Sequence, residues 1–323
     1  IKSTGGINFP LLTILLNTHM NYLILTPDGV GSTMLQRILT MCLYLEGEKV
    51  TNTHELTNGL ELKNGLAVKK FELQYTQNLS QITDVLKQSA EDTMLVSRLA
   101  KYHLDSRNDG TDDQKYFFDF LNKHFEKKIM CVRENIFEYA MSWSIREKSG
   151  ILNVYNKEDR DKVSQVSKVD EIYFIQKCQE YVKYVNWVET NFPNIQQISY
   201  EGMLMNSDSI METLTGYENT FTDHFGITLN SIIKKEYSFL QSAGDLSNEE
   251  ARGLVRYRLT SKDMMQKKII MSVPFKNTTL SDKKRQIKNF DACLDKFYMF
   301  AKNHNWIDQS KATYDFWNEE HIC

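Results

Sequence analysis

Short apolar runs alternate along the chain with segments whose apolar residues recur every three or four positions. The apolar runs of strand length are 22–25, 94–99, 128–132 and 195–200. The segments predicted to be helical are 34–39, 83–89, 117–125, 136–148 and 171–192. Strands that alternate with amphipathic helices predict an α/β fold around a central, mostly parallel sheet.

The remaining segments carry turn residues or further helical patterns. Residues around 58–59 and 64–65 are polar and rich in turn formers, and residues 152–170 are predicted to form a surface loop. The last third of the chain is mainly helical, with a capping box at 247–250 and one amphipathic helix over 281–300. The sequence therefore predicts helical additions at the C-terminus of the α/β fold.

No internal repeat, low-complexity tract or linker divides the chain. Met20 stands directly before the first predicted strand, so we expect residues 1–19 to be an N-terminal extension and residues 20–323 to form a single domain. The apolar run at 9–16 is too short to cross a bilayer, which takes about 20 residues.

Composition and charge narrow the functional classes. Apolar residues make up 41% of the chain and charged residues 25%, which is typical of a soluble globular protein. The net charge of −3 argues against a dedicated nucleic-acid binder. The five cysteines and seven histidines show no C-x-x-C or H-x-x-x-H spacing, which argues against a metal site and a disulfide framework. We expect a cytoplasmic protein without a metal and without nucleic-acid or membrane partners.

The most informative motif is Gly29-Val30-Gly31-Ser32-Thr33, between the first predicted strand and a helix. A turn of this kind directs backbone N–H groups and the positive end of a helix dipole at one point, which suits a phosphate or a sulfate. Glycine permits a positive φ and close approach to an anion. The alternative is that the turn is ordinary α/β architecture.

Two familiar nucleotide motifs are absent. A Walker A loop needs a lysine before its Ser/Thr, but here Gly31 is followed directly by Ser32, so a nucleotide or nucleoside kinase is disfavoured. The dinucleotide fingerprint needs a third glycine where this chain has Met34. The loop is therefore predicted to bind an anion in another way.

A second pair of polar residues follows a later strand. Arg133 comes directly after the predicted strand 128–132, and Ser142 lies inside the following helix. A guanidinium and a hydroxyl at the edge of a sheet suit a phosphate. The alternative, favoured from these residues alone, is that Arg133 pairs with a nearby acid and Ser142 packs between helices. We expect the loops at 27–33, 101–103, 133–135 and 200–202 to converge at the carboxyl edge of the sheet.

Three motifs in this order resemble the sulfotransferases that use 3′-phosphoadenosine 5′-phosphosulfate (PAPS). They are Gly31-Ser32-Thr33-x-Leu35-Gln36-Arg37, then Arg133-x-Asn135 with Ala140 and Ser142, then Ile198-Ser199-Tyr200-Glu201. The spacing is more similar to bacterial carbohydrate sulfotransferases, such as those acting on trehalose, than to the animal cytosolic enzymes. The resemblance spans about residues 22–204.

The resemblance implies a fold, a co-substrate and roles for individual residues. The fold would be P-loop-like, with three layers, and the acceptor would be a hydroxyl of a glycan or of a small metabolite. No metal is required. The residues implied to hold the 5′-phosphosulfate are Gly29, Val30, Gly31, Ser32 and Thr33. Arg133 and Ser142 would hold the 3′-phosphate, with Tyr200 near the nucleotide.

Transfer to a hydroxyl also needs a base that takes the acceptor's proton. His54 and Glu55 follow the first helix, where the bacterial relatives place a catalytic carboxylate, and His103 follows the next strand. Histidine titrates near neutral pH, whereas Glu55 would need burial to raise its pKa. Each of these three residues is a candidate base, and each can instead be a surface or packing residue.

The loop departs from the family in one respect. The family usually has a lysine or arginine before the serine of the loop, and this chain has Asp28-Gly29-Val30 there. Arg98 or Lys101 on the neighbouring strand, and less readily Arg37, are the candidates to supply the missing charge. Without such a cation, the alternative function is a catalytically inactive protein that binds a nucleotide or another anion.

Overall fold

A computed structural model of the chain describes residues 20–27, 29–55, 60–63, 66–69, 94–100, 112–151, 157–233 and 280–303. Its main sheet has five parallel strands in the order β2-β5-β1-β6-β7. These strands are β1 (Tyr22–Thr26), β2 (Val50–Glu55), β5 (Met94–Ala100), β6 (Lys127–Val132) and β7 (Gln196–Ser199). The prediction of an α/β fold around a parallel sheet is confirmed.

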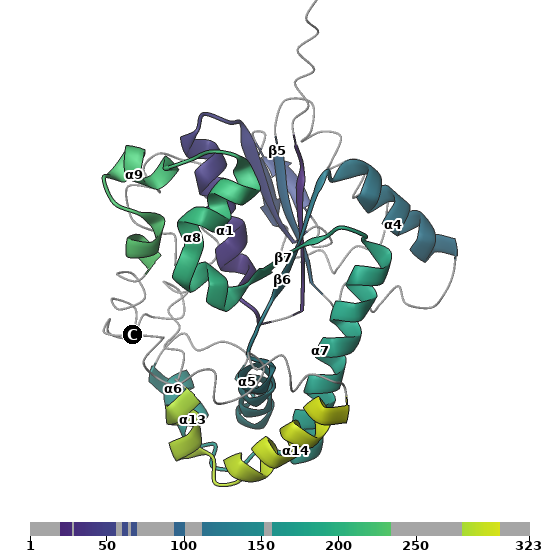
Figure 1. Cartoon of the computed structure of the whole chain (residues 1–323), viewed down its shortest axis with the longest axis vertical. Helices are drawn as coiled ribbons and strands as arrows, with labels where there is room; N and C mark the ends of the chain where they lie inside the picture. The colour runs from purple at the N-terminus through teal and green to yellow at the C-terminus, as the bar shows by residue number, and fades with distance from the viewer. Residues whose placement is uncertain are drawn as a thin grey trace, which may run out of the picture.

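Helices cover both faces of the sheet (Figure 1). They are α1 (Ser32–Leu45), α4 (Asp112–His124), α5 (Ile136–Ser149), α6 (Lys157–Ser164), α7 (Glu171–Asn191), α8 (Tyr200–Thr215), α9 (Thr220–Phe225), α13 (Leu280–Gln286) and α14 (Phe290–Asn303). In Figure 1, α1, α8 and α9 lie on one side of the sheet and α4 and α7 on the other. Helices α5, α6, α13 and α14 lie below the carboxyl ends of the strands.

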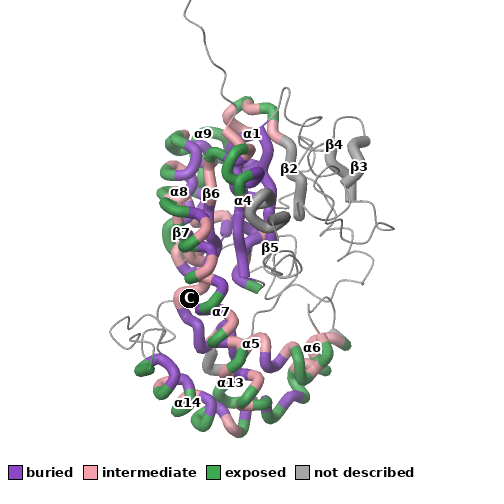
Figure 2. The backbone as a smooth tube through the Cα atoms, turned by 90° about the vertical axis from the view of Figure 1, so that its right-hand side faces the viewer, coloured by how far each residue is buried: buried purple, intermediate pink, exposed green. Residues whose placement is uncertain are grey.

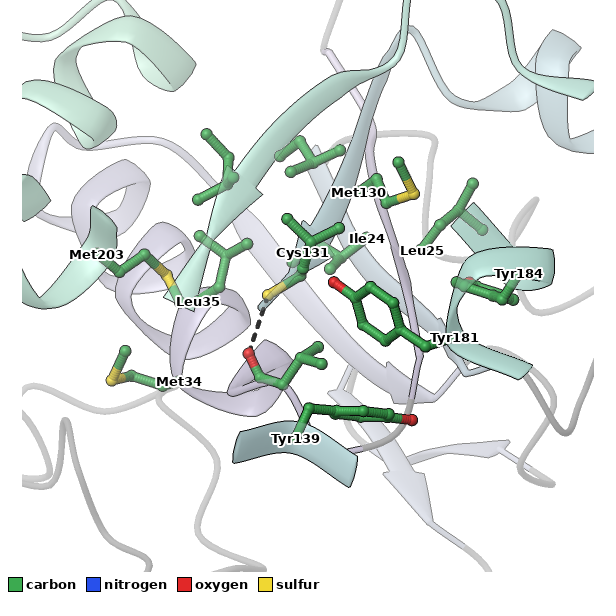
Figure 3. Close-up of a cluster of buried hydrophobic side chains, with 14 of the residues drawn as sticks. Ile24, Leu25, Met34, Leu35, Met130, Cys131, Tyr139, Tyr181, Tyr184 and Met203 are labelled. Atoms are coloured by element: carbon green, nitrogen blue, oxygen red, sulfur yellow. Dashed lines mark hydrogen bonds between the residues drawn. The ribbon is translucent and has the colours of Figure 1, made fainter. Parts of the chain in front are cut away.

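The centre of the sheet is the most deeply buried part of the molecule, as Figure 2 shows. All five side chains of β1 are buried, as expected for a strand with a parallel neighbour on each side and helices on both faces. Figure 3 shows one part of this core, where Leu35 of α1 lies on one side of the sheet and Leu25 and Met130 lie on the other. The position of β1 fixes where the loop that follows it can lie.

Aromatic contacts attach the C-terminal helices to the rest of the fold. The ring of Phe137 on α5 meets Phe174 on α7 at 5.3 Å between centroids. It also meets Phe290 and Phe297 on α14, at 5.1 and 5.6 Å. Edge-on aromatic pairs of this kind stabilise a core beyond the area that they bury. The predicted C-terminal helical additions therefore share one core with α5 and α7.

Two local predictions were wrong, over 152–170 and 281–300. The turns predicted around 58–59 and 64–65 lie outside the described residues, and the sequence did not predict the antiparallel pair beside them, β3 (Leu60–Lys63) and β4 (Leu66–Lys69). The predicted surface loop over 152–170 contains α6. Short polar strands and helices lack the apolar periodicity on which the predictions depended.

The helix predicted over 281–300 is divided into α13 and α14. The Lys288 N–H donates to the carbonyl of Ser167 at 2.8 Å. The side-chain amide of Asn289 both donates to and accepts from the backbone of Val169, at 3.0 and 3.2 Å. The first contact satisfies a backbone donor that a continuous helix would use itself, and the Asn289 side chain satisfies both backbone groups of Val169. The predicted extension 1–19, helix 83–89 and capping box 247–250 lie outside the described residues.

Candidate anion-binding site

The loop between β1 and α1 has the backbone geometry that an anion-binding turn needs. Gly29 and Gly31 both have φ of +80°. Gly31 is the N-cap of α1, no side chain among the described residues caps it, and the first turn of α1 has no acidic residue. In contrast, side chains cap α5, α7 and α8. The positive end of α1 thus faces this loop.

Arg98 brings a guanidinium to the loop from the neighbouring strand β5. Its Nη1 donates to Ser32 Oγ at 3.4 Å and also to Thr33 Oγ1. Its side chain is buried, although it carries a permanent charge. Of the cations predicted to replace the family's loop residue, Arg98 contacts the loop hydroxyls, whereas Lys101 lies outside the described residues.

Arg37 on α1 adds a second buried guanidinium close to Arg98. Burial and the charge of Arg98 together lower the pKa of Arg37 to about 10. The direction of this shift means that the charged form of Arg37 is disfavoured where it lies. An anion close to both guanidiniums would offset part of this shift.

Two aromatic rings pack against the glycines of the loop. A Cβ on Gly31 would lie 2.3 Å from Cδ2 of Tyr200, and a Cβ on Gly29 would lie 3.2 Å from Nε1 of Trp143 and 2.9 Å from Nη1 of Arg146. Glycine is therefore needed at both positions for φ and for packing. Contacts within the protein therefore account for both glycines without a bound anion. This agrees with the alternative that the turn is ordinary α/β architecture.

Cys131 on β6 contacts Val30, the buried residue in the middle of the loop. Its thiol donates to the carbonyl of Val30 at 3.3 Å, the dashed line in Figure 3. Burial raises the pKa of the Cys131 thiol. The thiol therefore remains protonated and acts as a donor that joins the loop to β6.

Arg133 is engaged by two carboxylates. Its Nε donates to Glu201 Oε1 at 2.7 Å and its Nη2 to Glu138 Oε2 at 3.0 Å. Burial lowers the pKa of Arg133, but Glu201 and Glu138 outweigh this and hold the pKa above its usual range. Its guanidinium also lies 4.7 Å from the centre of the Tyr200 ring. The pairing with nearby acids is the arrangement that the residues alone favoured.

Ser142 is joined to the same network by a lysine from the C-terminal part of the chain. Lys283 on α13 donates to Glu138 Oε1 and to Ser142 Oγ, each at 2.9 Å. Its side chain is only 5% exposed. Sequence reasoning missed Lys283, although it lies one helical turn before the apolar Ile287 and therefore on the inward side of its helix.

The expected convergence is confirmed for the three loops that are described. The Tyr200 ring lies against both Gly31 and the Arg133 guanidinium, so one aromatic ring separates the loop from Arg133. Glu201 Oε2 further accepts from the N–H of Glu134 at 2.9 Å. The predicted loop at 101–103, including His103, lies outside the described residues, as does Asp28.

The other two candidate bases are placed by their backbone. His54 and Glu55 form the carboxyl end of β2, where His54 pairs with Ser97 and Glu55 with Arg98 in the parallel register. The register shifts between Asn52 and His54. The end of β2 therefore lies beside the residue whose guanidinium contacts the loop, while the side chains of His54 and Glu55 are outside the described part of the structure.

The described residues hold no group of three or more His, Cys, Asp and Glu side chains that could bind a metal ion. Among these same residues, no helix has both the length and the apolar character needed to span a bilayer.

Comparison with known proteins gives no match. No protein-family model, no curated protein and no solved structure matches the chain. The structure shows an α/β protein in which the buried Arg98 contacts the glycine loop that follows the central strand.

Proposed function

We propose that this protein is a sulfotransferase, which moves the sulfuryl group of PAPS to a hydroxyl of a glycan or a small metabolite. The observation that carries the proposal is the contact of the Arg98 guanidinium with Ser32 and Thr33 at the positive end of α1. It supplies a cation at the loop, which the loop sequence lacks and which the resemblance to PAPS-dependent sulfotransferases requires.

The topology supports a P-loop-like arrangement. From β1 the sheet extends one way to β5 and β2 and the other way to β6 and β7. In parallel α/β sheets, ligands bind at the carboxyl ends of the strands where the strand order reverses. The loop after β1 lies at that point, next to the N-terminus of α1, which favours a phosphate-like group there.

The chemistry requires charge stabilisation rather than a metal in this proposal. The bond from sulfur to the acceptor oxygen forms while the bond from sulfur to the bridging phosphate oxygen breaks, and the electron pair stays on the 5′-phosphate. Arg98 and the backbone N–H groups at the start of α1 would stabilise that developing charge. Arg37, one turn along α1, adds to the same positive field.

The acceptor proton would go to a residue at the end of β2 or after β5. Glu55 pairs with Arg98 in the parallel register, which favours it among the candidates. His54, its neighbour, and His103 are the other candidates. General-base removal typically contributes about 10²–10⁴-fold to the rate.

Transfer of labelled sulfate from PAPS across a panel of sugars and small hydroxyl compounds tests the proposal. We expect transfer by the unaltered protein and a loss of about 10²-fold or more in Glu55→Gln if Glu55 is the base. His54→Ala and His103→Ala complete the set, and activity that survives all three substitutions would reject these bases. Arg285→Gln is the matched control, because it removes an exposed guanidinium of α13 and should leave the transfer rate unchanged.

The same measurement separates the catalytic proposal from the inactive alternative. The observation that favours the alternative is that Arg133, Lys283, Glu138 and Glu201 form a network with two positive and two negative charges, which gives no net attraction for a phosphate. Binding of 3′-phosphoadenosine 5′-phosphate (PAP) without transfer to any acceptor would identify a binding protein.

A further inference from the structure

The Glu138 carboxylate bridges two cations at the carboxyl edge of the sheet. Its Oε2 accepts from Arg133 Nη2 at 3.0 Å, and its Oε1 accepts from Lys283 Nζ at 2.9 Å. The ammonium of Lys283 also donates to Ser142 Oγ at 2.9 Å. A guanidinium and an ammonium therefore hold one carboxylate, and a hydroxyl lies next to the ammonium.

These three groups are of the kind that bind a phosphate monoester in proteins. A phosphate offers the same kind of oxygen acceptors as a carboxylate and carries more negative charge. Glu138 thus lies where an anion from outside could make the same hydrogen bonds. Its side chain comes from the first turn of α5 and is 15% exposed, so it is not fully enclosed by protein.

We propose that Glu138 is an internal anion that occupies the subsite formed by Arg133, Lys283 and Ser142, and that a ligand's phosphate monoester binds there by displacing it. The identity of that ligand as a 3′-phosphorylated nucleotide rests on the proposed function. The subsite itself rests on the distances above.

Charge explains why displacement is required. With Glu138 in place, the two cations are balanced by Glu138 and Glu201, and a dianion added to this group would meet two carboxylates. When Glu138 turns away, one positive charge is left uncompensated and the hydrogen-bond donors of Arg133 and Lys283 are released to the ligand.

The need to displace Glu138 makes the subsite selective among anionic ligands. A tethered carboxylate competes at a high effective concentration, so a weakly held anion such as free phosphate cannot displace it. A nucleotide that is also bound by the loop after β1 gains binding free energy there, and this gain offsets the cost of displacing Glu138. The Tyr200 ring, which contacts both Gly31 and Arg133, places the two subsites next to each other.

The test is the affinity of Glu138→Gln for three probes, measured by calorimetry: inorganic phosphate, adenosine and PAP. The apparent affinity of a subsite that is open only part of the time is reduced by that fraction, so we expect PAP and inorganic phosphate to bind about tenfold more tightly or better. Adenosine, which has no phosphate, should show no comparable gain. Equal gains for adenosine and PAP, no gain for inorganic phosphate, or no gain for PAP where the unaltered protein binds PAP, would overturn the proposal.

Two further variants control for charge and for folding. Glu158→Gln removes a carboxylate from an exposed pair with Lys162 and makes the same change in net charge, so it should bind all three probes as the unaltered protein does. Lys283→Met introduced into Glu138→Gln should abolish the gain, because it removes the uncompensated cation. A gain that persists without Lys283 would contradict the proposal.

Folding is measured in the same series. Glu138→Gln leaves a buried cation uncompensated, so we expect its melting temperature to rise with phosphate more steeply than that of the unaltered protein. Failure of Glu138→Gln to fold in phosphate buffer would overturn the proposal, because the anion should then replace the carboxylate.

This proposal and the sulfotransferase proposal can fail separately. If the unaltered protein does not bind PAP but Glu138→Gln gains affinity for inorganic phosphate, the nucleotide proposal fails and the internal anion stands. If PAP binds and Arg98→Gln weakens it, while Glu138→Gln does not tighten it, the internal anion fails and the loop site stands.

Discussion

At the residue scale, glycine in the loop after β1 meets two separable demands. Gly31 has φ of +80°, and a Cβ there would lie 2.3 Å from Cδ2 of the Tyr200 ring. Gly47, after α1, has φ of +86° but no atom within 4 Å of its Cβ position. The pair therefore distinguishes the strain of a left-handed backbone from the contact with Tyr200.

Gly31→Ala and Gly47→Ala should differ in their effect on stability. Gly47→Ala should lower the free energy of unfolding only by the cost of a left-handed backbone, about 1–2 kcal/mol. Gly31→Ala adds overpacking against Tyr200, a further loss of about 1–3 kcal/mol. Urea denaturation of both variants measures the difference, and equal losses would contradict the proposed contact.

Tyr200→Ala provides the control for this prediction. If the ring causes the additional loss, the double variant with Gly31→Ala should lose less stability than the sum of the single variants. Strict additivity would show that the extra loss has another origin.

Single residues differed in how far the sequence revealed them. Arg98 could be predicted as the cation of the loop, because parallel neighbours bring their carboxyl ends to one edge of the sheet. Lys283 could not be, because its partners Ser142 and Glu138 are 141 and 145 positions away. A sequence indicates that a lysine is on the inward side of a helix, but not which acid will face it.

At the element scale, one ion-pair network joins three helices to the end of β6. Arg133 follows β6, Glu138 belongs to α5, Glu201 to α8 and Lys283 to α13. Burial raises the pKa of Glu138, but Lys283 and Arg133 outweigh it and lower the pKa from 4.5 to about 2. The network is thus most stabilising when Glu138 is ionised.

The pH dependence of stability follows from this shift. Because the pKa of Glu138 is lower in the folded state, its contribution is present above about pH 4.5 and is lost as the pH falls from about 4.5 towards 2. The expected loss is on the order of 3 kcal/mol. Urea denaturation at several pH values should show a steeper acid loss in the unaltered protein than in Glu138→Gln.

The exposed ion pair between Glu158 and Lys162 provides a matched comparison for the pH experiment. Glu158→Gln should keep the steep acid dependence of the unaltered protein, because Glu158 lies in solvent with Lys162. An identical pH dependence in the unaltered protein and Glu138→Gln would show that the network does not hold the Glu138 carboxylate ionised.

Elements with a strong apolar period were predictable, and those defined by distant contacts were not. The buried strands β1 and β5 and the helices α5 and α7 match the predicted ranges closely. The division between α13 and α14 was missed because it depends on Ser167 and Val169, which are distant in sequence from Lys288 and Asn289. Local periodicity contains no information about such partners.

At the scale of the whole molecule, the sheet order places the predicted motifs together. The sequence predicted parallel strands, but the order β2-β5-β1-β6-β7 depends on long-range pairing and comes from the structure. With β1 at the centre, the loop at 29–33 and the start of α8 meet at one edge. The candidate site was therefore predictable in its parts, whereas the Glu138 bridge within it was not.

The measurement that most directly tests the loop site is the dissociation constant of PAP for the unaltered protein and for Arg98→Gln. A hydrogen bond to a charged group contributes about 1.5–3 kcal/mol, so we expect PAP to bind Arg98→Gln about 10- to 100-fold more weakly. Arg285→Gln, which removes an exposed guanidinium paired with Asp282, should leave the affinity unchanged. Equal affinity of the unaltered protein and a folded Arg98→Gln, or no binding of PAP to either, would contradict the proposed site.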